Sequence, residues 1–158
     1  MKMHFLCALH RAELSSKSNL AINCWQNGFD AGQLLYEQGM WHEAAPHLGC
    51  AFETAEIILS TSAVDRLNAC ELFTYSALLL ADTFMKIHLL RHAHAICTLT
   101  ITRLERELNY ISNTQHAIKN HLSQVYERIH QIDKQMANST ATEQNAISLQ
   151  QLTFAANH

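Results

Sequence analysis

The sequence contains few of the residues that interrupt secondary structure. Its 158 residues include one proline and four glycines, and only 16% of them are charged. β-Sandwiches and barrels of this size need more frequent turn signals than this composition provides. Long helices joined by short polar turns fit better, and the length is enough for one domain with a sizeable core.

Long apolar runs and basic clusters are also missing. No stretch of the sequence approaches the roughly 18 consecutive apolar residues of a membrane span, and the apolar run near residue 5 is too short for a signal peptide. The net charge is −3, and no run of Lys and Arg marks a nucleic-acid footprint. We therefore expect a cytoplasmic protein with no membrane and no nucleic-acid partner.

The cysteines are odd in number and widely spaced. They are Cys7, Cys24, Cys50, Cys70 and Cys97. Each lies among apolar residues of a helix-like segment, so reduced and buried thiols are the simplest interpretation. This interpretation agrees with a cytoplasmic location, where thiols are kept reduced.

Apolar residues recur at intervals of three and four along most of the chain, which is the helical period. The pattern predicts helices over about 3–14, 20–38, 41–59, 63–87, 92–110 and 113–136. Gly39 stands where a left-handed C-cap is needed, and Pro46 falls near a first turn, where a missing N–H costs little. The 63–87 helix is apolar on most sides and should be central. We expect an all-α fold of five to six helices in antiparallel hairpins.

The last predicted helix carries a heptad stripe of apolar residues. Its members are Ile118, Leu122, Val125, Ile129, Ile132 and Met136. The same register reaches back to Leu104, which favours one long helix, whereas Ser112 and Gln115 fit a capping box, which favours a break. We expect the break. A single domain should then cover residues 1–136, followed by a polar tail over 137–158 that packs loosely or is disordered.

One predicted hairpin carries a family signature. The residues that form it are Gly32, Gly39, Trp41, Glu43, Ala44 and Ala51. At these offsets the segment resembles a tetratricopeptide repeat, with small residues where two helices approach, a glycine at the turn and an aromatic residue after it. In a weaker second copy, Ala93 follows Ala44 by 49 residues, against about 34 in the standard repeat, and His88 replaces the turn glycine. The resemblance implies hairpins stacked as a short superhelix.

In this family, the first helix of each hairpin lines a groove for an extended peptide or a partner helix. The resemblance therefore implies a protein–protein interaction module, either an adaptor or a chaperone-like protein. Carried over position by position, the groove residues are Gln26, Phe29, Gln33, Tyr36 and Glu37 from the first copy and Tyr75, Leu78, Asp82, Met85 and Lys86 from the second. The basic clamp that some members use for a C-terminal carboxylate has no counterpart here. Alternatively, Phe29, Leu78 and Met85 face the next helix.

Two other functions fit parts of the sequence. The heptad stripe from Ile118 to Ile132 could pair with a second copy and form a homodimer. His88, His92 and His94 could bind a metal ion or haem, but the turn expected beside them separates their faces and no carboxylate completes a ligand set. The sequence contains no catalytic motif and no phosphate-binding glycine loop. We expect no metal, no cofactor and no enzymatic activity.

Overall fold

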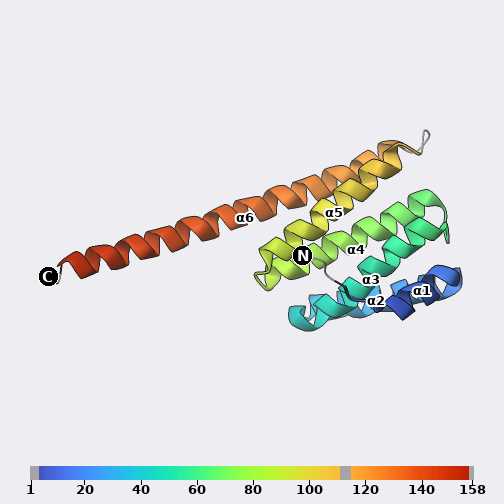
Figure 1. Cartoon of the computed structure of the whole chain (residues 1–158), viewed down its shortest axis with the longest axis horizontal. Helices are drawn as coiled ribbons and strands as arrows, with labels where there is room; N and C mark the ends of the chain where they lie inside the picture. Colours follow the sequence, from blue (N-terminus) through green and yellow to red (C-terminus); the bar gives the residue numbers. More distant parts are fainter. Residues whose placement is uncertain (1–3, 111–114, 157–158) are drawn as a thin grey trace.

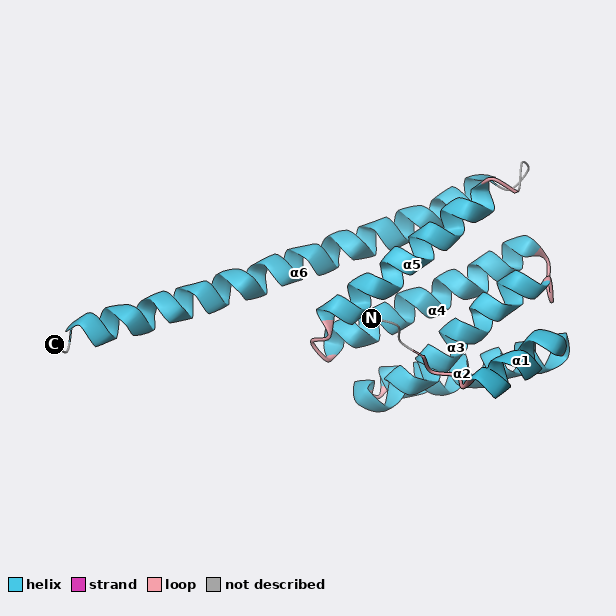
Figure 2. Ribbon diagram, in the orientation of Figure 1, coloured by secondary structure: helices cyan, strands magenta, loops and turns pink. Residues whose placement is uncertain are grey.

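The structure is a computed structural model that describes residues 4–110 and 115–156, with side chains up to residue 144. Over these residues the chain consists of helices and short connections, as Figures 1 and 2 show. The helices are α1 (Ala8–Ser16), α2 (Ser18–Glu37), α3 (Trp41–Thr61), α4 (Arg66–Lys86), α5 (Leu90–Leu108) and α6 (Gln115–Ala156). The predicted all-α fold of five to six helices is confirmed.

The helices pack mainly against their neighbours in the chain. α2 packs against α3, α3 against α4, α4 against α5 and α5 against α6, while α1 lies on α2 and α3. α6 also contacts α4, and Figure 1 shows it running back along α5 and then continuing far beyond the other helices. The break that we favoured is confirmed, because α5 ends at Leu108 and α6 folds back on it. The proposed cap Ser112 lies outside the described residues.

α3 and α4 form the middle of the stack. Phe52 of α3 and Phe73 of α4 are buried and stack with their ring centroids 5.1 Å apart. Aromatic pairs in such a geometry add to the stabilisation from burying apolar area. α4 contacts α2, α3, α5 and α6, which agrees with the central place expected from its apolar sequence.

The two long hairpins, α2–α3 and α4–α5, are closed by the same turn. Gly39 and His88, which are 49 residues apart in the sequence, both adopt left-handed backbone conformations, with φ of 75° and 61°. In each turn the next amide, that of Met40 or Leu89, donates to the carbonyl five residues earlier, at 2.9 Å and 2.8 Å. α3 and α5 then begin at corresponding positions. The internal repeat in the sequence is therefore also a repeat in backbone geometry.

Small residues allow α2 and α3 to approach closely. A Cβ atom at Gly32 would lie 2.5 Å from Cγ of Leu48, so this position admits only glycine unless Leu48 moves. Ala44 and Ala51, the small residues of α3, are fully buried. Ala81, which corresponds to Gly32 in the second hairpin, is also fully buried. The close contacts expected from the sequence are present.

Two helix starts differ from the sequence prediction. α1 begins at Ala8 rather than near residue 3, because the segment before it is bound to α3 by side-chain contacts described below. α4 begins at Arg66, whereas the sequence placed the start of this helix near residue 63. Ser62 ends α3 in a left-handed conformation, and Asp65 caps α4.

α6 is longer than the sequence predicted. It continues as a helix to Ala156, over the segment that we expected to be a polar tail. Residues 137–156 contain no proline or glycine, so no strong helix breaker interrupts the helix. Within the described residues, no helix combines the length and the apolar character needed to cross a membrane.

Candidate functional site

A groove with a cavity volume of about 390 Å³ runs between α2 and α4. Its lining residues are Phe29, Gln33, Tyr36 and Glu37 from α2 and Tyr75, Leu78, Leu79 and Asp82 from α4. In each helix nearly all of them recur every three or four residues, so they share one face. Other faces of α2 and α4 pack on α3 and α5. The first helix of each hairpin therefore supplies one wall of the groove.

A second hollow continues the groove between α4 and α6. It has a volume of about 430 Å³ and is lined by Leu78 of α4 and by Ser123, Gln124, Glu127 and Arg128 of α6. Leu78 lines both hollows, so the two adjoin at this side chain of α4. We call the surface around both hollows, formed by α2, α4 and α6, the groove face.

The floor of the groove face is apolar and aromatic. Phe29, Tyr36 and Leu78 are half-buried, whereas Tyr75 is 44% exposed. Phe29 stacks on the buried Trp25 with ring centroids 5.2 Å apart, which fixes its ring beside the groove. Aromatic side chains of this kind provide a large contact area at a low cost in conformational entropy.

One ion pair joins α4 to α6 across the groove face. Arg128 pairs with Asp82, and the two side chains are 24% and 27% exposed. Burial lowers the pKa of Arg128, and Tyr36 opposes this shift, but a guanidinium keeps its proton in proteins. The pair holds α6 against α4 and places Arg128 over the second hollow.

His121 of α6 lies beside Tyr75 of α4. The two rings meet edge to face, with their centroids 6.4 Å apart. Burial lowers the pKa of His121 from its usual 6.5, and the negative charge of Glu71 partly opposes this shift. His121 is therefore neutral at pH 7 and adds no positive charge to the groove face.

Seven of the ten residues expected to form the groove do line it, namely Phe29, Gln33, Tyr36, Glu37, Tyr75, Leu78 and Asp82. The other three lie outside the lining. Gln26 is two turns from Gln33 on α2 and donates a hydrogen bond to Asp30. Met85 packs against the core, and Nζ of Lys86 lies 5.4 Å from the centroid of the Trp41 ring. That these residues bind a partner stays a prediction.

Several lining residues were missed by the sequence analysis. Leu79 lies beside the predicted stripe of α4, and the remaining ones are Ser123, Gln124, Glu127 and Arg128 of α6. The heptad stripe indicates which face of α6 is buried, but not that the adjoining face borders α4. The signal in the sequence that could have located this face is the position of Gln124 and Arg128, which lie one helical turn apart and beside the stripe.

The heptad stripe of α6 packs inside the chain, and its alternative use as a dimer surface stays a prediction. The residues offered for self-association are buried or partly buried in the core: Ile118, Leu122, Val125, Ile129 and Ile132. Because α6 folds back on α5, the stripe covers the open side of the second hairpin instead of a second copy. A homodimer through this stripe would require α6 to leave α5.

The three histidines near the second turn have different neighbours. His94 approaches Asp133 of α6, with Nε2 3.5 Å from Oδ1. His92 packs against Phe84 with ring centroids 5.5 Å apart, and His88 is exposed. In the part of the chain that the structure describes, no three His, Cys, Asp or Glu side chains are placed to share a metal ion.

The five cysteines are all unpaired, but they are not all buried as predicted. Burial raises the pKa of Cys97 to about 12 and that of Cys70 to about 11, where the charge of Glu107 adds to the effect. Such thiols stay protonated at pH 7 and are poor nucleophiles. Cys7 is exposed, because it ends the N-terminal segment and caps α1 by accepting from an amide.

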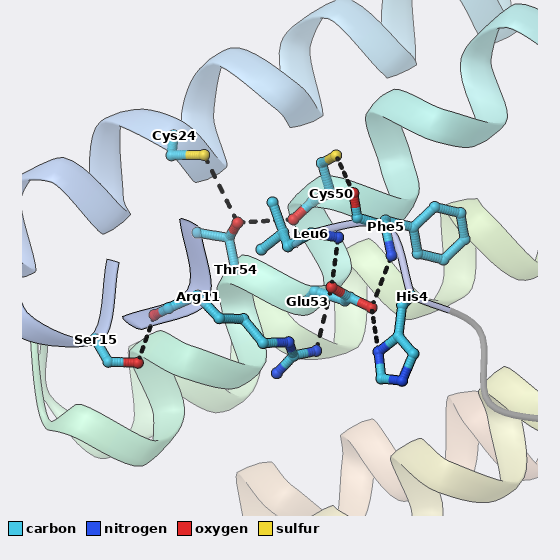
Figure 3. A network of polar contacts seen from close by, with 9 residues as sticks. All are labelled: His4, Phe5, Leu6, Arg11, Ser15, Cys24, Cys50, Glu53 and Thr54. Carbon is cyan, nitrogen blue, oxygen red and sulfur yellow. Dashed lines mark hydrogen bonds and ion pairs between the residues drawn. The ribbon is translucent and has the colours of Figure 1, made fainter. Parts of the chain in front are cut away.

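A second polar cluster surrounds Glu53, a buried carboxylate of α3 (Figure 3). Its oxygens accept from the backbone amides of Phe5 and Leu6 at 3.0 Å and 2.9 Å, and Nη2 of Arg11 lies 3.1 Å away. The Phe5 ring fills the space above Gly49, where a Cβ atom would collide with it. These partners all come from the chain's own N-terminal segment, so the cluster is an anchor for that segment.

The chain matches no family model, no curated protein and no solved structure. The groove face is therefore the feature of this chain that points to a function.

Proposed function

We propose that this chain is a protein–protein interaction module, of the adaptor or chaperone-like type, that binds a peptide segment or a partner helix in the groove face. The observation that carries the proposal is the pair of adjoining hollows along α2, α4 and α6, with aromatic and polar lining residues. Helices and extended peptides bind such grooves through a few apolar anchor residues. The proposal includes no enzymatic step.

The repeated turn supports a tetratricopeptide-like arrangement. Both hairpins present their first helix to the groove, as the resemblance implies, and both close with the same left-handed turn. In this view α6 is the first helix of a third, incomplete hairpin that covers the end of the stack. Terminal elements of this kind are needed to shield the apolar faces of repeat arrays.

Tyr36 and Tyr75 are the best candidates for anchor positions. They lie on opposite walls of the same hollow, one on α2 and one on α4. Tyrosine is enriched among the residues that contribute most to binding energy at protein interfaces. The five free thiols suit a reducing compartment, so we keep the cytoplasm as the proposed location.

The proposal is tested by affinity purification of the tagged chain from its native cells, with the double variant Tyr36→Ala, Tyr75→Ala beside it. The matched control is Tyr126→Ala, which removes a similarly exposed tyrosine (48% against 44% for Tyr75) from α6 outside the groove lining. Circular dichroism and thermal unfolding confirm that each variant is folded.

We expect one or more proteins to be retained by the natural chain and by Tyr126→Ala and to be lost from the groove double variant. Retention by all three would show that the partner binds elsewhere and would refute the groove proposal. Absence of any specific partner from the natural chain would also count against an adaptor function.

A further inference from the structure

We infer that the groove face selects a positively charged segment of a partner protein, in which an apolar side chain enters the groove and flanking Lys or Arg side chains meet its acidic rim. The inference rests on the proposed function and specifies the class of partner. It is carried by the distribution of charge around the two hollows.

Acidic residues outnumber basic ones around the groove. The charged residues lining the two hollows are Glu37, Asp82, Glu127 and Arg128, which gives three acids minus one base, or −2. One helical turn from the lining residues, Asp30 and Glu71 add two acids and Lys86 and Lys119 add two bases, so the total stays at −2. The net charge of the whole chain is −3. Two of the three net negative charges of the chain therefore lie on the groove face, and the rest of the chain sums to −1.

Four of these carboxylates form no ion pair within the described residues. Each one accepts from a neutral side chain four residues away on its own helix: Gln26 donates to Asp30, Gln33 to Glu37, Tyr75 to Glu71 and Gln131 to Glu127. These bonds orient the carboxylates without neutralising them. Elsewhere, the buried Glu53 and Glu107 are paired with arginines.

Two basic side chains beside the groove are already engaged. Arg128 is paired with Asp82, and Lys86, one turn beyond Asp82 on α4, stacks over Trp41 of α3. The rim of the groove face can therefore accept additional cations from a partner. An acidic segment would meet like charges, which is a strong source of discrimination at interfaces.

The positions of the charges suggest how such a segment lies. Leu78 is at the centre, where the two hollows adjoin, with Glu37 on the α2 side and Glu127 on the α6 side. A segment crossing α4 would place an apolar side chain between Phe29 and Leu78. Its basic side chains, before and after that residue, would then reach both acidic walls.

The test uses the purified full chain and three matched sets of synthetic peptides, which share central Leu, Phe or Met residues and differ only in being cationic, neutral or anionic. Binding is measured by fluorescence anisotropy at low and high salt. The double variant Glu37→Gln, Glu127→Gln removes two rim charges. The matched control Glu43→Gln, Glu105→Gln removes two charges from α3 and α5, outside the groove face.

We expect the cationic set to bind at least about tenfold more tightly than the neutral set at low salt, and high salt to remove most of this difference. The rim variant should lose the preference, and the control variant should keep it. Equal binding of neutral or anionic peptides that is still sensitive to Tyr36→Ala would overturn the charge inference and leave the groove proposal standing. Absence of any binding sensitive to Tyr36→Ala would overturn both.

Discussion

The two hairpins share one backbone geometry and reach it with different residues. The first hairpin uses Gly39 at its left-handed turn position and Gly32 at its closest helix contact, whereas the second uses His88 and Ala81. The turn hydrogen bonds are nevertheless the same to within 0.2 Å. Helix length and backbone hydrogen bonding therefore set the geometry of each hairpin. The residues at the turn and at the closest helix contact determine the free energy needed to adopt that geometry.

The hairpins also differ in how they use a buried carboxylate. Glu53, on α3 of the first hairpin, binds the N-terminal segment. Glu107, on α5 of the second, is fully buried and binds Nε of Arg66 at 2.5 Å and Nη2 of Arg103 at 3.4 Å. Arg66 begins α4, so Glu107 connects the two helices of its hairpin at the end opposite the turn.

The largest expected effect is therefore at Glu107. Glu107→Gln should lower the free energy of unfolding by about 3 kcal/mol, because the fully buried carboxylate gives up its charged contacts with the exposed Arg66 and the largely buried Arg103. Glu53→Gln should cost about 1–2 kcal/mol and act mainly on the N-terminal segment, since its main partners are two amides of that segment. Urea unfolding measures the first effect, and hydrogen exchange at the amides of Phe5 and Leu6 measures the second.

Glu105→Gln is the control, because Glu105 is an exposed neighbour on the same helix as Glu107. Its effect should stay below about 0.5 kcal/mol. A cost of less than 1 kcal/mol at Glu107 would mean that the arginines find other partners, and the assignment of Glu107 as the link between α4 and α5 would be wrong.

At the closest helix contacts, the first hairpin should prefer glycine at position 32 and the second should prefer alanine at position 81. Gly32→Ala should destabilise the chain by about 2 kcal/mol although alanine favours helices, because the new Cβ would displace the buried Leu48. Ala81→Gly should cost about 1 kcal/mol through loss of helix propensity. Thermal unfolding of both variants tests the difference. If Gly32→Ala raised the melting temperature, α2 and α3 would have room that the structure does not show.

Much of the fold followed from the helical period, which located the helices. The groove residues, such as Phe29, Gln33 and Tyr36, were instead implied by the resemblance to a tetratricopeptide repeat, and the helical period places these three on one face of α2. Gly39 was predictable as a turn because a left-handed residue is most often glycine. His88 gave no such signal by its residue type, and its turn was predicted from the gap between the 63–87 and 92–110 helices.

The remaining features depend on which segments meet in space. A heptad stripe shows that a face is buried, but not whether α5 or a second copy covers it. The structure buries the stripe from Ile118 to Ile132 within the chain. The Asp82–Arg128 pair and the α6 wall of the groove were missed for the same reason, because both depend on α6 packing beside α4. The binding of Phe5 by Glu53 joins residues 48 positions apart, which no local pattern encodes.

The two turns offer the smallest effect and the most direct test of the comparison. Gly39→Ala should destabilise the chain by about 1 kcal/mol, since a side chain at positive φ is strained even though no atom lies within 4 Å of the new Cβ. His88→Gly should stabilise it by up to about 1 kcal/mol, because glycine relieves the same strain at an exposed position. Urea unfolding midpoints of the two variants give the signs.

The changes in unfolding free energy should have opposite signs, because Gly39→Ala adds a Cβ at a left-handed position and His88→Gly removes one at the equivalent position. His88→Ala separates backbone strain from side-chain contacts: it keeps a Cβ at positive φ, so its unfolding free energy should stay close to that of the natural chain. If His88→Ala and His88→Gly were both destabilising, the imidazole would be making a stabilising contact. The second turn would then be maintained by its histidine, and not by the backbone geometry that it shares with the first.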